Sequence, residues 1–181
     1  LRFFVGRNQM DIAGLGPATI NLLVERGWVK DIADLFRFDA DHLLDEEGFA
    51  ERTVAALKRS IESSKEKPFS TVLPSIGLAD VGPKITSLLM QAGFHDIDQL
   101  YAAVDAASTQ EQPKVFTDID GIGERTATGL IRQLGDPANR RLIKSLRLLG
   151  LKFADSQPPS SASAHEAVFA GQAWCITGSF D

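Results

Sequence analysis

The 181 residues are enough for one or two domains with a sizeable core, and the content of 44% hydrophobic and 24% charged residues is ordinary for a soluble globular protein. No apolar run approaches the roughly 20 residues of a membrane span, and residues 1–10 lack the apolar stretch of a signal peptide, so we expect no membrane partner. The single cysteine, Cys175, excludes an internal disulfide and a cysteine-based zinc site within the chain, and favours a cytoplasmic location.

The net charge of −5 is low for a nucleic-acid-binding protein, which usually carries a basic face. A formal charge count omits backbone amides and helix dipoles, so the acidity predicts modest, salt-sensitive affinity for DNA rather than excluding it. The three histidines (His42, His95 and His165) have no ligand spacing, and we predict no metal site. Because the chain begins with Leu1 rather than Met, we expect a fragment or a processed product.

The first half of the chain, residues 1–66, contains two turn–helix units. After an aromatic and basic stretch over 1–10, the turn Gly14–Gly16 precedes a helix that Gly27 ends as a C′ residue. The spacing predicts a short amphipathic helix over 28–38, with Trp28 in the core.

The second unit has the turn Gly48–Ala50 and a clear amphipathic helix over 52–64. If the second turn position needs a positive φ, Ala50 is strained there, and this copy is structural rather than DNA-binding.

The second half, residues 67–153, repeats this order. It predicts a helical turn (71–76), the turn 80–82 with its helix (83–93), a connecting helix (96–107) that resembles 28–38, a helix–turn–helix (116–134) and a last helix (137–150). Residues 154–167 have the Pro, Ser and Ala content of a flexible linker, and 168–181 alternate like the first β-strand of a truncated further domain.

The four turns align as GLG-PATI, GFA-ERTV, DVG-PKIT and GIG-ERTA, with their second positions at residues 16, 50, 82 and 123. The intervals of 34, 32 and 41 residues indicate a repeated supersecondary unit. This is the helix-hairpin-helix pattern, and we predict an all-α fold of four such motifs in two tandem pairs.

Each turn places unpaired N–H groups at a helix N-terminus, which is a natural anion site. The two positions after the turn hold Pro or Glu and then, in three copies, a basic residue. The predicted DNA-binding residues are Gly14, Gly16, Gly48, Arg52, Gly82, Lys84, Gly121, Gly123 and Arg125. The threonines that come next (Thr19, Thr53, Thr126) are open to two interpretations, a phosphate contact or a hydrogen bond to their own helix.

Five segments of the chain resemble the helix-hairpin-helix region of bacterial NAD-dependent DNA ligases. They are FVGRNQMDIAGLG, LVERGWVKDIADLF, IGLADVGPKITSLL, DIDGIGERTATGLI and DPANRRLIKSLRLLGLKF. The later segment CITGSF resembles the start of the BRCT domain that follows this region in the family. The resemblance implies a larger enzyme that seals nicks in duplex DNA during replication and repair, using NAD, magnesium and zinc, in the cytoplasm with the nucleoid. It implies no catalytic, cofactor-binding or metal-binding residue in this chain, which contains no Lys-x-Asp-Gly stretch. The implied partners are nicked double-stranded DNA and the other domains of the enzyme, and the turns would contact phosphates across the minor groove, the first and fourth most strongly.

Two alternatives remain open. The module occurs in structure-specific nucleases and Holliday-junction proteins, although these lack the flanking segments found here, and a scaffold that binds no DNA would suit the acidic charge. A basic cluster late in the chain is either a DNA-binding face or the solvated side of the last helix. It consists of Arg140, Arg141, Lys144, Arg147 and Lys152.

Overall fold

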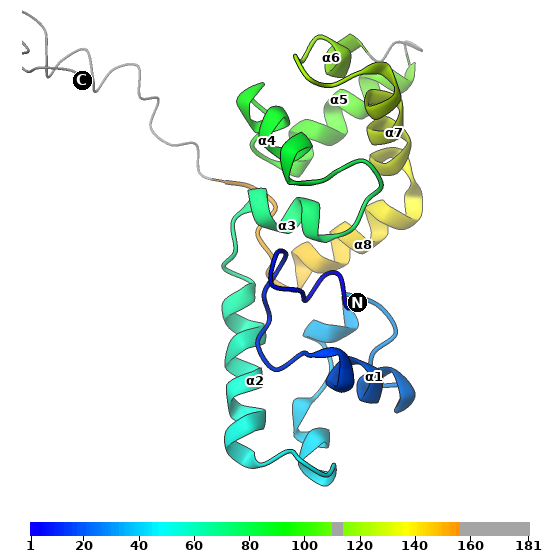
Figure 1. Ribbon diagram of the computed structural model, residues 1–181. Coiled ribbons are helices and arrows are strands. Elements are labelled where there is room, and N and C mark those ends of the chain that lie inside the picture. Colours follow the sequence, from blue (N-terminus) through cyan, green and yellow to red (C-terminus); the bar gives the residue numbers. More distant parts are fainter. Residues whose placement is uncertain (110–113, 156–181) are drawn as a thin grey trace, which may run out of the picture.

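The computed structural model describes residues 1–109 and 114–155, and within them the chain is helical (Figure 1). The predicted strand over 168–181 and nearly all of the predicted linker lie outside the described residues. The elements of the first pair, in chain order, are α1 (Pro17–Glu25), the 3₁₀ turns η1 (Asp34–Phe36) and η2 (Ala40–Asp45), and α2 (Glu51–Ser64). Those of the second pair are α3 (Phe69–Ser75), α4 (Pro83–Gln91), α5 (Ile97–Thr109), α6 (Lys114–Thr117), α7 (Glu124–Gly135) and α8 (Pro137–Leu148).

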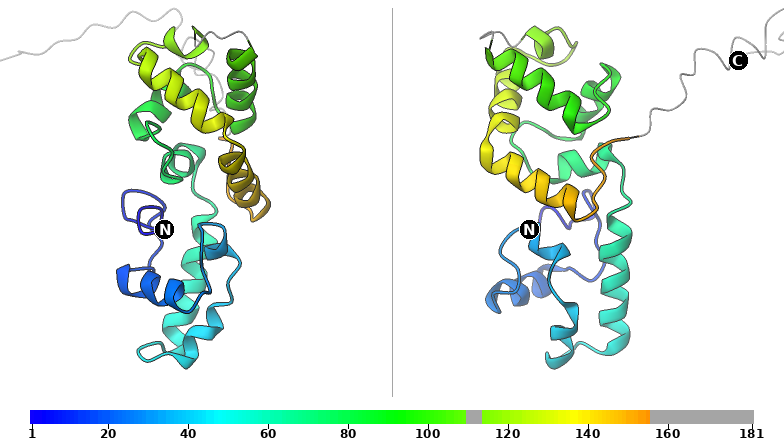
Figure 2. Two further views of the ribbon diagram at one scale, coloured as in Figure 1. Left: turned by 90° about the vertical axis from the view of Figure 1, so that its right-hand side faces the viewer. Right: turned by 180° about the vertical axis from the view of Figure 1, so that it is seen from behind.

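The two pairs stack end to end in an elongated molecule, the first pair below and the second above in Figure 1, as the turned views of Figure 2 also show. Their buried apolar side chains nevertheless form one cluster that extends from Phe4 to Phe153. Phe4, Phe69 and Phe116 are almost completely buried in it. Burial of this apolar surface is the main force that holds the short helices in place, because helices of this length are marginal alone.

Glycines end three of the helices in the way that the sequence predicts. At the end of α1, Gly27 has a φ of 72°, and its amide and that of Trp28 donate to the carbonyls of Val24 and Leu23. The same pair of hydrogen bonds closes α4 at Gly93 and α8 at Gly150. These are Schellman motifs, which need the left-handed conformation that glycine adopts without strain. Trp28, half-buried after the first of them, packs on the core as predicted and stacks on His42.

One predicted helix is wrong. Residues 28–38 form only the 3₁₀ turn η1, whereas the corresponding segment of the second pair forms the full helix α5. The carboxylate of Asp34 accepts the amide of Lys30, and that of Asp31 accepts the amide of Asp34. Such local side-chain bonds compete with a regular helix and favour a turn.

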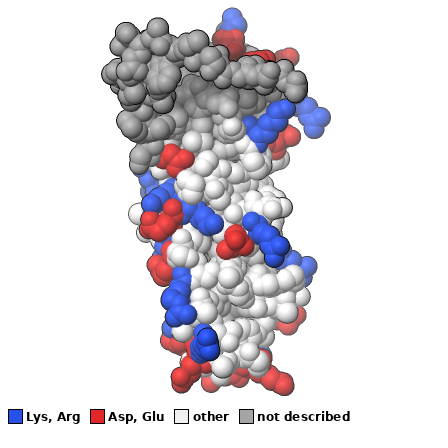
Figure 3. Space-filling view, turned by 60° about the vertical axis from the view of Figure 1, so that its left-hand side comes forward, with Lys and Arg blue, Asp and Glu red and all other residues white. Residues whose placement is uncertain are grey.

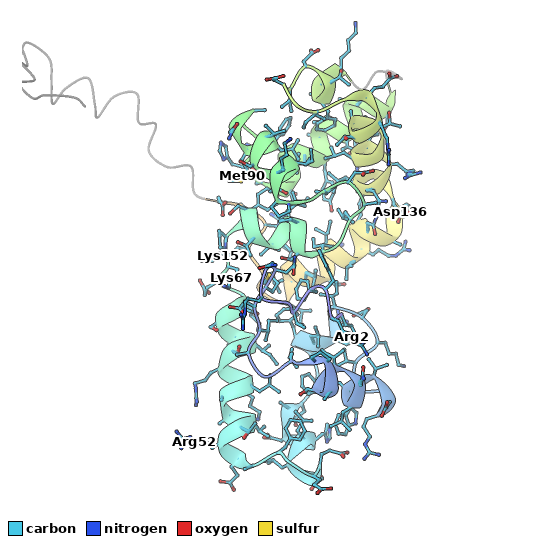
Figure 4. The ribbon with its side chains drawn as sticks, viewed as in Figure 1. Arg2, Arg52, Lys67, Met90, Asp136 and Lys152 are labelled. Carbon is cyan, nitrogen blue, oxygen red and sulfur yellow. The ribbon has the colours of Figure 1, made fainter. Side chains whose placement is uncertain are left out.

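The last described residues bind back to α3 and α5 within the second pair, and at the junction of the two pairs one ion pair joins them to the first pair. The amide of Ile97 donates to the carbonyl of Phe153, and the carboxylate of Asp155 accepts the amide of Phe69 at 2.7 Å. Lys152 lies near Lys67 at this junction (Figure 4) and forms an ion pair with Glu66. Residues 154 and 155, the first two of the predicted linker, are therefore bonded to the folded part.

Candidate nucleic-acid interface

The four turns share one backbone structure. Each contains a hydrogen bond from its apolar middle residue to the carbonyl three residues earlier, with N–O distances of 3.0–3.3 Å. The bonds join Leu15 to Ile12, Phe49 to Glu46, Val81 to Leu78, and Ile122 to Ile119. The middle residues Leu15, Val81 and Ile122 are buried and Phe49 is half-buried, so each turn is anchored to the core at its centre.

The positive φ occurs at the first residue of each three-residue turn (14, 48, 80 and 121). It does not occur at the last residue (16, 50, 82 and 123), which is the position called second above. The φ values are 90° at Gly14, 89° at Gly48, 62° at Asp80 and 86° at Gly121, the pattern of a type II turn. The second position is extended, and Ala50 has a φ of −94°. The expectation that Ala50 is strained is therefore wrong, because any residue adopts this conformation, and the second turn has the same backbone as the others.

Glycine at the second position is not required by the fold. A Cβ added at Gly16, Gly82 or Gly123 would meet no atom of the described chain within 4 Å, and their φ values lie between −68° and −90°. The missing side chains instead leave the backbone accessible to a group from outside. Such close approach is one of the main uses of glycine in proteins.

The helices behind the turns also begin without a cap. The N-caps of α1, α2, α4 and α7 are the second turn residues, and none of them makes a side-chain capping bond.

Other helix starts are capped by carboxylates, namely α3 by Asp155, α5 by Asp96, η2 by Asp39 and α8 by Asp136. The uncapped N-terminal amides behind the turns thus remain available to an external acceptor. Asp136 lies at the junction of α7 and α8 (Figure 4).

The basic residues predicted to contact phosphate are all exposed and unpaired. Arg52, Lys84 and Arg125 form no ion pair or side-chain hydrogen bond within residues 1–109 and 114–155. Arg52 projects outward from α2 (Figure 4), on the side opposite α1. The threonine hydroxyls at 19, 53 and 126 likewise form no side-chain hydrogen bond in the described part, so a bond to their own helix is not what they provide.

The late basic cluster is largely engaged within the protein. Arg140 binds Asp105 and lies 4.5 Å from the centre of the Tyr101 ring, and Arg147 binds Asp98. A hydrogen bond and the charge of Asp98 raise the pKa of Arg147. These residues fasten α8 to α5, which favours a structural role for this part of the cluster. In Figure 3, one face of the molecule carries basic and acidic side chains interspersed rather than a continuous basic patch.

The surroundings of the second turn are the most acidic. Asp45, Glu46, Glu47 and Glu51 all lie within a few residues of Gly48. A hydrogen bond from Arg26 holds the pKa of Glu46 below its usual value and ties this turn to the end of α1. The other acidic groups would repel a phosphate, so the charge around the second turn opposes this role, whereas its backbone does not.

Three basic residues outside the predicted set lie beside turns. Arg2 and Arg7 line a cavity of about 430 Å³ with Gly14 and Gly16. Arg132 lines another, of about 560 Å³, with Arg125. Arg132 lies seven residues after Arg125, and this spacing places both on one helix face and gave a usable signal. Nothing in the pattern of residues 1–10 singled out Arg7.

Within the described residues no group of three or more metal-ligating side chains comes together. None of the helices described there has the length and hydrophobicity needed to cross a bilayer.

Four uncapped helix starts behind identical turns define a tandem array of helix-hairpin-helix motifs. The sequence model of the SAM-like helix-hairpin-helix tandem family matches residues 10–63 and 74–136, and the chain belongs to this family. The first matched segment lies within residues 1–66 and the second within residues 67–153.

The resemblance to DNA ligases is confirmed. The chain is 41% identical over 183 residues to a DNA ligase of Leptospira biflexa, with 100% of this chain and 26% of the relative covered. It is 37% identical over 188 residues to a DNA ligase of Leptospira interrogans, which covers 99% of this chain and 26% of the relative. A DNA ligase of Roseiflexus castenholzii is 33% identical over 178 residues, with 98% and 23% covered. The chain thus spans about a quarter of the length of these relatives.

Proposed function

We propose that this chain is a DNA-binding part of a DNA ligase and that its turns hold DNA phosphates through backbone amides. The contrast between helix starts carries this proposal. The helices α3, α5 and α8 begin at a carboxylate, whereas those behind the turns have no cap and have an open glycine or alanine before them. Phosphate oxygens are suitable acceptors for such amides.

Contacts of this kind fix the position of DNA without reading its bases, which suits an enzyme that closes nicks in any sequence. We place the turns across the minor groove on both sides of a nick, with Arg52, Lys84 and Arg125 adding charge-assisted contacts. The first and fourth turns would hold most strongly, since only these two have glycine at both the first and the last residue of the turn.

The remaining three quarters of the relatives' length is the natural place for the chemistry. We propose that the whole protein is an NAD-dependent ligase, with magnesium and zinc bound by its other domains and a BRCT domain beginning near residue 168. The residues described here do not fit a metal site, and we assign no reaction step to them. A cytoplasmic location with the bacterial nucleoid follows from the same proposal.

Fluorescence anisotropy of the chain on nicked duplex, intact duplex and single strand, across a salt series, tests this function. We expect duplex binding whose logarithm falls linearly with log salt, by about 0.9 per phosphate contact. Arg125→Gln should weaken binding about three- to tenfold and lower that slope by nearly one unit.

Arg37→Gln is the matched control, since Arg37 pairs with Asp34 away from the turns, and it should change little. Absence of duplex binding at low salt, or equal effects of the two variants, would contradict the proposal.

A further inference from the structure

Asp80 stands out among the turn residues. It has a φ of 62° at the position that is glycine in the other three turns. A residue with a side chain is uncommon in this region, although Asp tolerates it better than most. Within the described chain its carboxylate makes no hydrogen bond or ion pair that would explain its presence. An uncommon backbone conformation at a residue whose carboxylate has no partner in the described chain motivates a functional hypothesis.

The Asp80 side chain lies in the cleft between the third turn and α7. This cleft, about 560 Å³ in volume, is lined by Asp80, Glu124, Arg125, Thr128, Gly129 and Arg132. Gly129 gives the carboxylate its room, because a Cβ there would lie 3.1 Å from Asp80 Oδ2.

Arg125 and Arg132 form no ion pair in the described structure, although two carboxylates line the same cleft. Elsewhere in the molecule, arginines close to a carboxylate do pair with it, as Arg26 does with Glu46 at 2.6 Å. Each guanidinium therefore keeps a planar set of N–H donors for an external acceptor, and phosphate matches that geometry.

The two carboxylates of the cleft differ in what the fold needs. Glu124 occupies the first turn of α7, where a negative charge stabilises the helix dipole. Asp80 has no such benefit, and its charge opposes any phosphate that enters between the arginines.

We propose that Arg125 and Arg132 together hold one phosphate of the DNA backbone in this cleft and that Asp80 limits the strength of that contact. The inference rests on the proposed function and adds Arg132 and Asp80 to it. A ligase must release sealed DNA, and a negative charge beside one phosphate site limits how tightly that site holds the product.

Asp80→Asn is the deciding variant, since it removes the charge, keeps the shape, and asparagine tolerates the same φ. We expect it to bind intact duplex about three- to tenfold more tightly than wild type at low salt, with a steeper salt dependence. Glu25→Gln, the same charge change on an exposed residue at the end of α1, is the control and should have a smaller effect. Arg132→Gln should weaken binding, and in its background the gain from Asp80→Asn should largely disappear.

If the wild type binds duplex but Asp80→Asn and Glu25→Gln change the affinity equally, this inference alone is overturned. The same holds if Arg132→Gln binds with wild-type affinity. Absence of wild-type binding would instead contradict the proposed function, and this inference with it. Circular dichroism of each variant establishes that the fold is retained.

Discussion

Asp80 and Gly129 are complementary: the carboxylate of one fills the space that a side chain on the other would need, with Oδ2 3.1 Å from the position of the missing Cβ. The mirror contact joins the other turn of the pair, because a Cβ at Gly121 would lie 3.1 Å from Leu88 of α4. The third turn thus packs on α7 and the fourth on α4. This reciprocal packing holds the two turns of the second pair in a fixed relation.

The Asp80–Gly129 pair predicts a coupled effect on stability. Gly129→Ala gains about 1 kcal/mol of helix propensity but displaces the Asp80 side chain, so alone it should change the free energy of unfolding little. In an Asp80→Gly background the displacement is absent and the same alanine should stabilise by about 1 kcal/mol. Urea unfolding of the four proteins measures the coupling, and strictly additive effects would contradict the contact.

Gly123→Val should separate binding from stability. At Gly123, φ is −78° and ψ is 166°, and the space around it is open, so valine fits and loses only about 1 kcal/mol as a poorer N-cap. Its side chain blocks the backbone, and we expect duplex affinity to fall about three- to tenfold. Ala50→Gly, the opposite change in an equivalent turn, is the control and should not weaken binding. Unchanged affinity of a folded Gly123→Val would show that this turn does not contact DNA.

Asp155 should stabilise the start of the second pair. Its carboxylate accepts the amides of Phe69 and Ser70, at 2.7 and 3.4 Å, and so caps α3. Asp155→Ala should lower the free energy of unfolding by about 1–2 kcal/mol, because it leaves a partly buried helix start uncapped. Asp118→Ala, at an exposed carboxylate without a side-chain bond in the described part, serves as the control in the same denaturant titration. Equal stability of the two variants would contradict the capping role.

Tyr101 should make stability fall at high pH. Burial raises the pKa of Tyr101 to about 12, and its hydroxyl has no hydrogen-bond partner in the described structure. The folded state then keeps a proton that the unfolded state loses near pH 10, so stability present below pH 10 decreases between about 10 and 12. Because the chain contains one tyrosine, absorbance of the tyrosinate follows this titration directly.

Tyr101→Phe is the test of that cause. It should leave stability at pH 7 within about 1 kcal/mol of wild type, since it removes a buried hydroxyl without a partner, and it keeps the ring under Arg140. It should also remove this part of the loss at high pH. A tyrosine that titrates near 10 in the folded protein would exclude the mechanism.

The sequence predicted the repeated part of this structure well, because turn, cap and apolar spacing are local signals. The helices behind the turns begin where glycine, alanine or proline indicated, and Gly27 ends α1 as expected. The position of the positive φ was assigned wrongly, although the signal was present. Alanine at 50 and aspartate at 80 already indicate that the first residue of the turn, not the last, is the one with left-handed backbone, because aspartate adopts that conformation more readily than alanine.

Contacts between distant residues were beyond prediction. The pairing of Arg140 with Asp105 and of Arg147 with Asp98 depends on how α8 packs on α5, and no spacing in the chain specifies it. The same holds for the cap that Asp155 provides to α3. The candidate interface residues were selected because they recur with the turns, whereas Arg7 lies outside the repeat and gave no such signal.

The buried middle residue of each turn has a consequence for the speed of association. Leu15, Val81 and Ile122 fix their turns to the core, and a hydrogen bond inside each turn sets its backbone conformation. The amides are therefore already oriented, so a phosphate that binds them as proposed would cost little loop entropy. A rigid, sequence-independent surface of this kind favours rapid capture and rapid release, as needed to sample many positions along a duplex.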